Sequence, residues 1–206
     1  MAKLTDNFKF LESKELSTAK YKEARTLKDA FEAADEIGYP IILKANTDEH
    51  KTEIKGVSDT IHNALHLKKE WARITEEINK NNLPYETLVV QQKIEGTEII
   101  VGAKKDSVFD KVVMIGSGGT LTEITKDISF RVIPVTKTDA KEMVSEIKAS
   151  KLLEGYRGAK KANKKSLTDT IKKFSEIFAE EKMTEADLNP IIVNERKAWI
   201  VDARLR

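Results

Sequence analysis

The chain has 206 residues, which is enough for one sizeable domain or for two small ones that share a site. Charged residues make up 34% of it, but the formal net charge is only +2, so no global field demands a nucleic-acid partner. Cys is absent, which excludes a disulfide framework, a thiolate nucleophile and a Cys-ligated metal, and no apolar run approaches the roughly 18 residues of a membrane span.

The N-terminal segment, residues 1–25, is charged and irregular and predicts an arm or a helix that leans on the domain. Its start, MAKLTDNFKF, lacks the apolar core of a signal peptide, so we expect a cytoplasmic protein with no membrane contact. The stretch TLKDAFEAADEIG then predicts a helix, with Thr26 and Asp29 as a capping box and Gly38 at its end. The apolar run PIILKA predicts a strand that is buried on both faces and that ends near Lys44.

Residues 58–81 predict a second helix, with Ser58 as its cap and an apolar stripe that includes Ile61, Leu65 and Ile74. The rest of the chain is richer in strands, with a glycine loop at 116–119, two short strands within 120–135, and a basic linker at 154–165. The order is not a regular alternation of strands and helices, so it predicts an α+β fold in two lobes divided near residue 90. The other predicted strands are 87–94, 97–104, 111–116, 187–194 and 197–205, and the other predicted helices are 139–150 and 166–181.

No common nucleotide motif is present, because the chain has neither GxxxxGK followed by Ser or Thr nor a GxGxxG that opens a helix. A nucleotide site of another design can still be assembled. Lys44 at a strand end could meet phosphate oxygens, and glycines in the loop let a backbone approach an anion closely. Asn189 and Asp202, at the ends of two closing strands, are hard oxygen ligands that suit Mg²⁺ shared with phosphates.

Each of these features also has a plainer interpretation. A lysine at a strand end is usually a solvated edge residue, a GxGG segment is usually only a turn, and Asn-Pro usually starts a turn. The hypothesis of a nucleotide site therefore depends on the order of the segments along the chain.

That order resembles the ATP-grasp fold, in which a nucleotide binds between two lobes. Within this fold it resembles the β subunit of ADP-forming acetyl-CoA synthetases, which belong to the NDP-forming acyl-CoA synthetases and are related to the succinyl-CoA synthetase β subunit. The resemblance covers roughly residues 26–206. The segments that carry it are GYPIILKANTDEHKTEIKGV, VVQQKIEGTEIIVGAKKD, VVMIGSGGTLTEITKDISFRVIP, EADLNPIIV and IVDAR.

The resemblance implies an N-terminal arm at 1–25, a first lobe at 26–90 and a second lobe at 91–206, with ADP or ATP bound together with Mg²⁺. It implies that the run from Gln91 to Ile94 meets adenine through backbone groups and that Glu98 lies near ribose or phosphate. The expected metal ligands are Asn189 and Asp202. The expected nucleotide-binding residues are Lys44, Lys51, Gln91, Gln92, Lys93, Ile94, Glu98, Gly116, Gly118, Gly119, Glu123, Asp127 and Arg131.

His50, in the segment DEHKTE, matches the family's second histidine, which is implicated as a phosphoryl relay. The resemblance implies a partner α subunit with CoA-binding and phosphohistidine domains, whose phosphoryl group passes through His50 to ADP. Imidazole suits this task, because it is nucleophilic when neutral and a good leaving group once phosphorylated. Without the resemblance, an exposed loop histidine is the simpler interpretation.

Two other functions remain open from the sequence. One is a non-catalytic module that senses nucleotides and is paired with an acyltransferase; the other is an RNA-binding accessory protein that uses the basic run RGAKKANKK. His62 and His66 lie four residues apart on a predicted helix, and we interpret them as surface residues.

The chain departs from the family pattern at three places. The family usually has glycine where Lys55 stands, Phe-Gly-Pro where Phe109, Asp110 and Lys111 stand, and glycine or an apolar residue where Ser117 stands.

Overall fold

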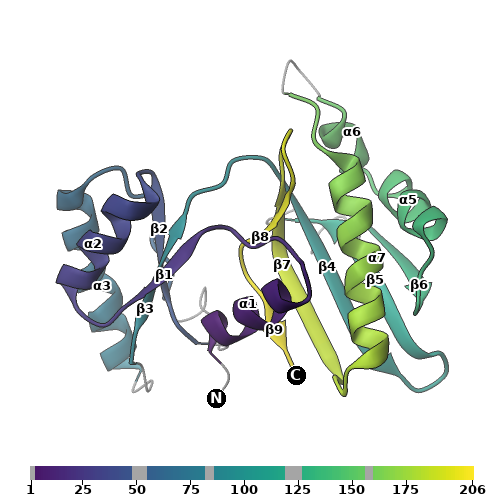
Figure 1. Ribbon diagram of the computed structural model, residues 1–206, viewed down its shortest axis with the longest axis horizontal. Helices are drawn as coiled ribbons and strands as arrows, with labels where there is room; N and C mark the ends of the chain where they lie inside the picture. The colour runs from purple at the N-terminus through teal and green to yellow at the C-terminus, as the bar shows by residue number, and fades with distance from the viewer. Residues whose placement is uncertain (1–2, 48–54, 82–85, 119–126, 156–159) are drawn as a thin grey trace. The chain divides into compact units, whose positions relative to one another are not determined.

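The computed structural model describes residues 3–47, 55–81, 86–118, 127–155 and 160–206 (Figure 1). The chain divides into two compact units, one formed by residues 1–9 and 19–94 and the other by residues 10–18 and 95–206. No helix in the described ranges is long and apolar enough to cross a membrane. The α+β class expected from the sequence is confirmed.

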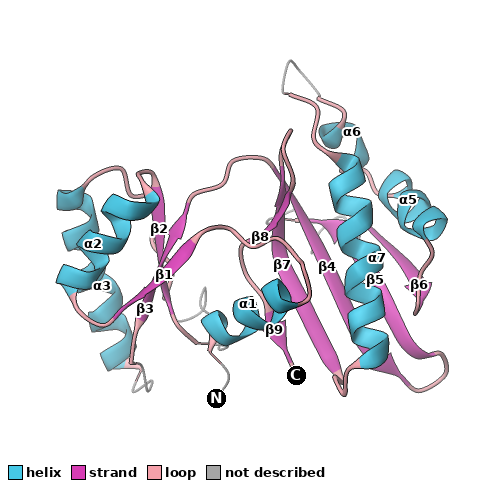
Figure 2. Cartoon of the chain, viewed as in Figure 1, coloured by secondary structure: helices cyan, strands magenta, loops and turns pink. Residues whose placement is uncertain are grey.

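The first unit contains an antiparallel sheet of three strands, in the order β1-β3-β2, within its described residues. Two helices, α2 and α3, cover one face of this sheet (Figure 2). The apolar core between them includes Ile41, Leu43, Leu88 and Val90, all fully buried. The bounds are α1 Leu4–Ser13, β1 Tyr21–Ala24, α2 Leu27–Ile37, β2 Ile41–Ala45, α3 Ala64–Lys80 and β3 Leu88–Gln92.

Helix α2 begins where its sequence predicted. The side chain of Thr26 accepts a hydrogen bond of 3.2 Å from the backbone amide of Asp29, and the Asp29 carboxylate accepts one of 2.9 Å from the Thr26 amide. Both donors would otherwise lack partners at the first turn, so this capping box is confirmed as the start signal.

Helix α3 starts six residues later than expected, and the prediction of Ser58 as its cap was wrong. Asn63 caps the helix instead. Ser58 and Ile61 lie on an extended segment beside β2: the backbone amide of Ser58 donates to the Leu43 carbonyl over 2.9 Å, and Ile61 exchanges hydrogen bonds with Ile41. This pairing satisfies backbone groups that a longer helix would have used. It also shifts the buried stripe, which leaves Leu65 80% exposed; the residues that α3 buries are Leu67, Glu70, Ile74 and Ile78.

The expected division of the chain also needs correction. Residues 21–24 form β1, which pairs with β3, so 1–25 is not a separate arm. The boundary between the units lies after Ile94 rather than at 90, because β3 continues to Gln92 within the first unit. In 127–135 the structure has one strand, β6, where two short strands were expected within 120–135; residues 119–126 lie outside the described part.

In the second unit the described residues form a six-stranded antiparallel sheet in the order β6-β5-β4-β7-β8, with β9 paired to β7. Helix α7 contacts β4, β7 and β8, and α5 contacts β6, so the helices cover one sheet face (Figure 1). Buried residues on that face include Val101, Ala103, Val113 and Ile115. The bounds are β4 Thr97–Asp106, β5 Asp110–Ser117, β6 Ile128–Val132, α5 Lys137–Glu146, α6 Ser150–Leu153, α7 Lys164–Glu180, β7 Glu185–Val193, β8 Ala198–Ile200 and β9 Arg204–Leu205.

Two of the sequence departures keep a backbone conformation that favours glycine. Lys55 has φ 50° and Asp110 has φ 63°, both in the left-handed region. The turn before Asp110 is held by the Asp106 carboxylate, which accepts hydrogen bonds from the amides of Val108 (2.9 Å) and Phe109 (3.0 Å). The family glycines at these positions are therefore replaced without a change in the sign of φ.

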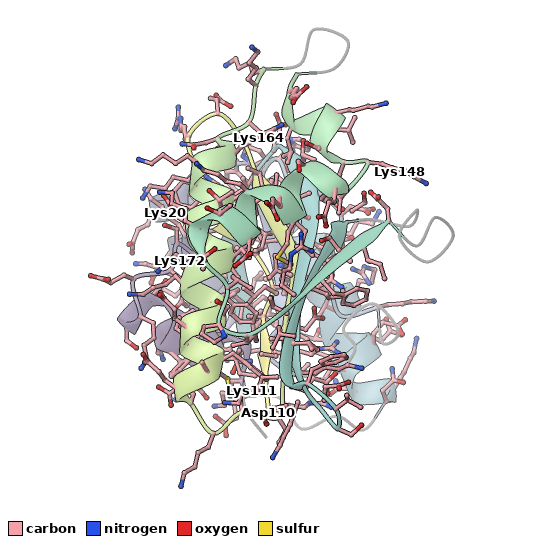
Figure 3. All side chains as sticks on the ribbon, turned by 90° about the vertical axis from the view of Figure 1, so that its right-hand side faces the viewer. Lys20, Asp110, Lys111, Lys148, Lys164 and Lys172 are labelled. Carbon is pink, nitrogen blue, oxygen red and sulfur yellow. The ribbon has the colours of Figure 1, made fainter. Side chains whose placement is uncertain are left out.

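Lys111, which stands where the family usually has proline, has a distinct structural role. Its ammonium donates hydrogen bonds of 2.8 Å to the carbonyls of Phe178 and Ala179, in the last turn of α7. Figure 3 shows Lys111 beside the lower end of that helix. The carbonyls in the last turn of a helix have no partner within the helix and carry partial negative charge, so this cation stabilises the end of α7.

We expect Lys111→Met to lower the free energy of unfolding by about 1 to 2 kcal/mol, because methionine keeps most of the side-chain bulk but cannot donate to the carbonyls. Lys182→Met is the matched control, since Lys182 is exposed near the same helix end and should change stability little. Urea unfolding of both variants measures this, and equal effects would contradict a specific helix cap.

Candidate functional site

In the first unit, the sheet face opposite α2 and α3 carries Lys44 and Gln91. Side chains alternate along a strand, so Lys44 points away from the helix face on which Leu43 is buried. Lys44 lies opposite Val89, and Ile42 lies opposite Gln91, so these residues share one face. Lys44 is buried, so its ammonium is held close to this face and not at a solvated strand edge.

The Gln91 side chain is 1% exposed, and its Nε2 has no hydrogen-bond partner among the residues that the structure describes. A buried donor without an acceptor costs roughly 1 to 3 kcal/mol, so the site fits a ligand that supplies an acceptor atom. The backbone amides of the next two residues serve the protein itself: Gln92 donates to the Lys20 carbonyl over 2.8 Å, and Lys93 donates to the Pro40 carbonyl over 3.1 Å. An adenine base bound here would therefore contact other groups of the run from Gln91 to Ile94.

In the second unit, strand register brings a second group of expected site residues onto one face. Along β4, Glu98, Ile100 and Gly102 alternate with the residues buried under the helices. Gly116 lies opposite Ile100, and Asp187 lies opposite Gly102. Glu98, Gly116 and Asp187 therefore share the face that α5 and α7 do not cover.

A β-bulge places Asn189 on this part of the sheet. The register of β4 and β7 passes from Ile99–Ile191 to Val101–Leu188, so Asn189 and Pro190 both oppose Ile100. A bulge bends the strand and re-aims a side chain, and Asn189 is exposed here. Asn189 thus lies within β7, whereas the sequence had suggested that it lies at a strand end.

Asp187 is a site residue that the sequence reasoning missed. Burial raises the pKa of its carboxyl; Arg204, its partner on β9, opposes this, whereas the negative charge of Asp202 adds to it. The Asn189 side chain also hydrogen-bonds to Asp187. The signal was available, because residues two apart on a strand share a face and Asp187 precedes Asn189 by two.

Three oxygen-bearing residues lie in neighbouring segments here. Asp187 and Asn189 are on β7, and Asp202 lies between β8 and β9 in a segment beside β7, where the Val201 amide donates to the Pro190 carbonyl over 3.2 Å and Arg204 lies opposite Asp187. Carboxylate and amide oxygens suit Mg²⁺, and the unfavourable burial of Asp187 is the kind of charge that a cation relieves. The described residues include no group of three or more His, Asp or Glu that could hold a metal. Two carboxylates and one amide leave ligand positions of Mg²⁺ open, and phosphate oxygens are the groups that usually fill such positions.

The start of the glycine loop is packed tightly against β4. The Gly118 amide donates to the Glu98 carbonyl over 2.8 Å, and a Cβ on Gly118 would lie 2.6 Å from the Glu98 Cβ. A Cβ on Gly116 would lie 2.9 Å from the Asp127 carbonyl oxygen. Both positions require glycine, and the loop therefore leaves β5 directly beside Glu98.

Asp127, where the described chain resumes after Gly118, is held between β5 and the start of α6. Burial alone would raise the pKa of its carboxyl, but hydrogen bonds from the Lys148 amide (2.7 Å), the Ser117 hydroxyl and the Ala149 amide (3.2 Å) hold that pKa below its usual range. Ser117, the third departure from the family pattern, thus supplies one of these hydrogen bonds. The geometry gives Asp127 a structural role, and its contact with nucleotide stays a prediction.

Arg131 is not brought to the face that carries Asp187. It lies opposite Val113, which is buried on the helix face, and its guanidinium contacts the Glu146 carboxylate of α5 at 2.5 Å. Its expected contact with nucleotide has no support from this position.

His62 and His66 were expected to share a helix face. This was wrong, because His62 lies before α3 begins. Four expected site residues lie outside the described part of the chain, and their placement stays a prediction: His50, Lys51, Gly119 and Glu123.

Comparison with known proteins agrees with the fold. The model of the ATP-grasp domain family matches residues 3–206. The chain is 38% identical over 192 residues to the β subunit of ADP-forming acetate–CoA ligase I from Pyrococcus furiosus, covering 90% of this chain and 82% of that one. It is 37% identical to ADP-forming acetate–CoA ligase II from Archaeoglobus fulgidus, of which it spans 28% while 95% of this chain is covered.

A solved structure is also similar. The acetyl-coenzyme A synthetase 1 of Ca. Korarchaeum cryptofilum, in complex with coenzyme A and Ca-AMPCP, matches with a TM-score of 0.92 at 31% identity, covering 98% of this chain and 91% of that one. The family expected from the sequence is confirmed. The chain belongs to the ATP-grasp family and, within it, to the group that includes the β subunits of ADP-forming acetate–CoA ligases.

Proposed function

We propose that this chain is the nucleotide-binding part of an ADP-forming acyl-CoA ligase, and that it transfers a phosphoryl group between a partner's phosphohistidine and ADP. The observation that carries the proposal is the gathering of Asp187, Asn189 and Asp202 on β7 and the segment beside it, with β4 alone between β7 and the strand from which the glycine loop starts. A structure of the Korarchaeum enzyme, 30% identical to this chain, contains coenzyme A and Mg-AMPPCP and has a phosphohistidine segment that points towards the nucleotide binding site.

Asp187, Asn189 and Asp202 would hold Mg²⁺, which would supply positive charge against the phosphates. The protein's own groups would add to this. Lys44 would offer a positive charge to phosphate, and Gln91 would offer a buried amide donor to an acceptor of the ligand. Glu98 lies beside the loop at Gly118, where it would meet ribose or phosphate.

His50 would carry the phosphoryl group in two steps. Its imidazole nitrogen attacks the partner's phosphohistidine, so that one P–N bond forms as the other breaks and the partner's imidazole leaves. A β-phosphate oxygen of ADP then attacks phospho-His50, which forms ATP and returns neutral imidazole. Lys51 and Lys55 would balance the charge of the phosphoryl group in transit. This role rests on the sequence segment, because His50 and Lys51 lie outside the described residues.

The structure offers less to the two other functions. The non-catalytic interpretation depended on altered glycines, yet Lys55 and Asp110 keep the positive φ of glycine positions. The RNA-binding interpretation depended on a basic run, yet within its described part Lys160 pairs with Glu195 and Lys164 pairs with Glu154. No single observation favours either of them.

Asp187→Asn should weaken Mg-ADP binding by about tenfold, and it should raise the melting temperature of the free protein. Because burial raises the pKa of Asp187, its stability cost grows as pH rises from the ordinary pKa of aspartate, about 3.9, to the raised folded value, and persists above it. Asparagine has no such cost. Titration calorimetry and thermal melts at pH 7 measure both effects.

Asp202→Ala should lower Mg-ADP affinity by a similar factor, whereas Glu185→Gln, on an exposed residue of β7, should leave it unchanged. Equal affinity in the wild type and in Asp187→Asn would remove Asp187 from the site.

Lys44→Met should weaken ADP and ATP binding by about tenfold or more but leave adenosine binding nearly unchanged, because only the phosphates meet the ammonium. Calorimetry with the three ligands tests this. Equal losses for all three would place Lys44 near the base or would indicate a folding defect.

His50→Ala should abolish the acid-labile, base-stable phosphoryl label on this chain when it is mixed with its α partner, acyl-CoA, phosphate and Mg²⁺. Mg-ADP binding and the label on the partner should persist, because the change removes the carrier alone. His62→Ala controls for the loss of any histidine. Wild-type formation of ATP by His50→Ala would refute the relay.

A further inference from the structure

Strand β6 has the reverse of the usual amphipathic pattern. Its polar residues face helix α5: Ser129 is buried, and Ser129 and Arg131 both hydrogen-bond to the Glu146 carboxylate. Its apolar residues point the other way, with Ile128 39%, Phe130 52% and Val132 51% exposed. A strand that buries its polar residues and exposes its apolar ones leaves apolar surface in contact with water, which is unfavourable.

The exposed apolar residues continue onto β5. Val132 lies opposite Val112, and Phe130 lies opposite Met114, and both β5 residues are only partly buried. Cross-strand partners share a face, so these side chains form one surface. We call it the β5–β6 face; it comprises Val112, Met114, Ile128, Phe130 and Val132.

This surface is continuous with the candidate metal site. Phe130 lies opposite Met114, Met114 opposite Gly102, and Gly102 opposite Asp187, so the four residues form one row across the sheet. Neighbouring strands lie about 4.8 Å apart, so Phe130 is roughly 14 Å from Asp187 along this row. Gly102 has no side chain, so it places no bulky group between Met114 and Asp187 in this row.

We propose that the β5–β6 face is the docking surface for the partner subunit that presents its phosphohistidine segment to this site. This inference rests on the function proposed above. A phosphoryl donor must come within bonding distance of the metal site, so the subunit that carries it must contact surface next to Asp187. The β5–β6 face begins at Met114, with only Gly102 between Met114 and Asp187 in the row, so this face is placed to hold that subunit.

The sizes of the relatives favour this occupant over a second copy of the chain. This chain spans only 28% of the matching ligase from Archaeoglobus fulgidus. Most of that enzyme therefore lies outside the part that this chain resembles. A second copy on the β5–β6 face would also occupy the surface beside the site that the phosphoryl donor has to reach.

Phe130→Ser tests the proposal, because it removes the largest exposed apolar side chain of the surface without touching the metal site. Leu152→Ser is the matched control: Leu152, on α6, is 50% exposed and lies outside the β5–β6 face. The probe is the separately purified CoA-binding subunit of the same organism's ADP-forming ligase. Its Kd for each variant is measured by calorimetry, and ATP formation is followed at increasing subunit concentration.

We expect the Kd of Phe130→Ser for that subunit to rise about tenfold, with the rate at saturating subunit unchanged and Mg-ADP affinity equal to wild type. Leu152→Ser should match wild type throughout. An unchanged Kd for Phe130→Ser, or the same rise for Leu152→Ser, would overturn the docking surface. Self-association of the wild type that Phe130→Ser abolishes, with no effect on the subunit's Kd, would assign the face to a second copy.

Failure of the function itself is distinguishable, because it would leave the wild-type chain without Mg-ADP binding. Failure of the docking proposal alone leaves that binding intact.

Discussion

The two-residue period of a β-strand decides which side chains of the second unit can meet. Helices α5 and α7 occupy one face of its sheet, and Val101, Ala103, Val113 and Ile115 fill that face. Every residue in register with the alternate positions of β4 is then left on the open face. Asp187, Gly116 and Glu98 meet there because of strand register alone, although almost ninety residues separate Glu98 from Asp187 along the chain. A register slip of one residue would bury these groups under α7.

The open face carries costs that a purely structural sheet would avoid. Asp187 holds a carboxyl whose burial raises its pKa, Asn189 and Pro190 interrupt the ladder as a bulge, and two glycines stand where any Cβ would collide with neighbouring backbone. In the first unit, Gln91 buries an amide donor without an acceptor. Locally unfavourable features of this kind, gathered on one face of each unit, are typical of ligand sites, because a bound ligand supplies the missing charge or acceptor.

The elements that could be predicted from the sequence are those whose signals are local. The capping box of Thr26 and Asp29 set the start of α2, and the apolar run at 41–45 marked a strand. The start of α3 could not be predicted from Ser58, because a cap-forming residue is also a good partner for a neighbouring strand, and the pairing of Ile61 with Ile41 is a contact between distant residues. Arg131 shows the same limit at the site, because register with Val113 takes it away from the open face and no local signal encodes that pairing. Asp187 differs, because its spacing of two residues from Asn189 is a local signal that both share one strand face, and register with Gly102 brings that face to the site.

The departures from the family pattern show why residue identity alone is a poor guide to whether such a site is intact. Lys55 and Asp110 replace glycines, but the backbone at both keeps positive φ; aspartate tolerates that region better than most residues, and the amides before Asp110 are held by Asp106. Lys111 replaces a proline and meets the carbonyls that end α7. Ser117 replaces a smaller or apolar residue and donates to Asp127, which in turn holds the amides of Lys148 and Ala149. Asp110, Lys111 and Ser117 therefore lie beside or within contacts of their own unit, and the chain leaves β5 beside Glu98. Agreement of the motif letters is thus not needed for the fold to form, because local contacts accommodate the residues that differ.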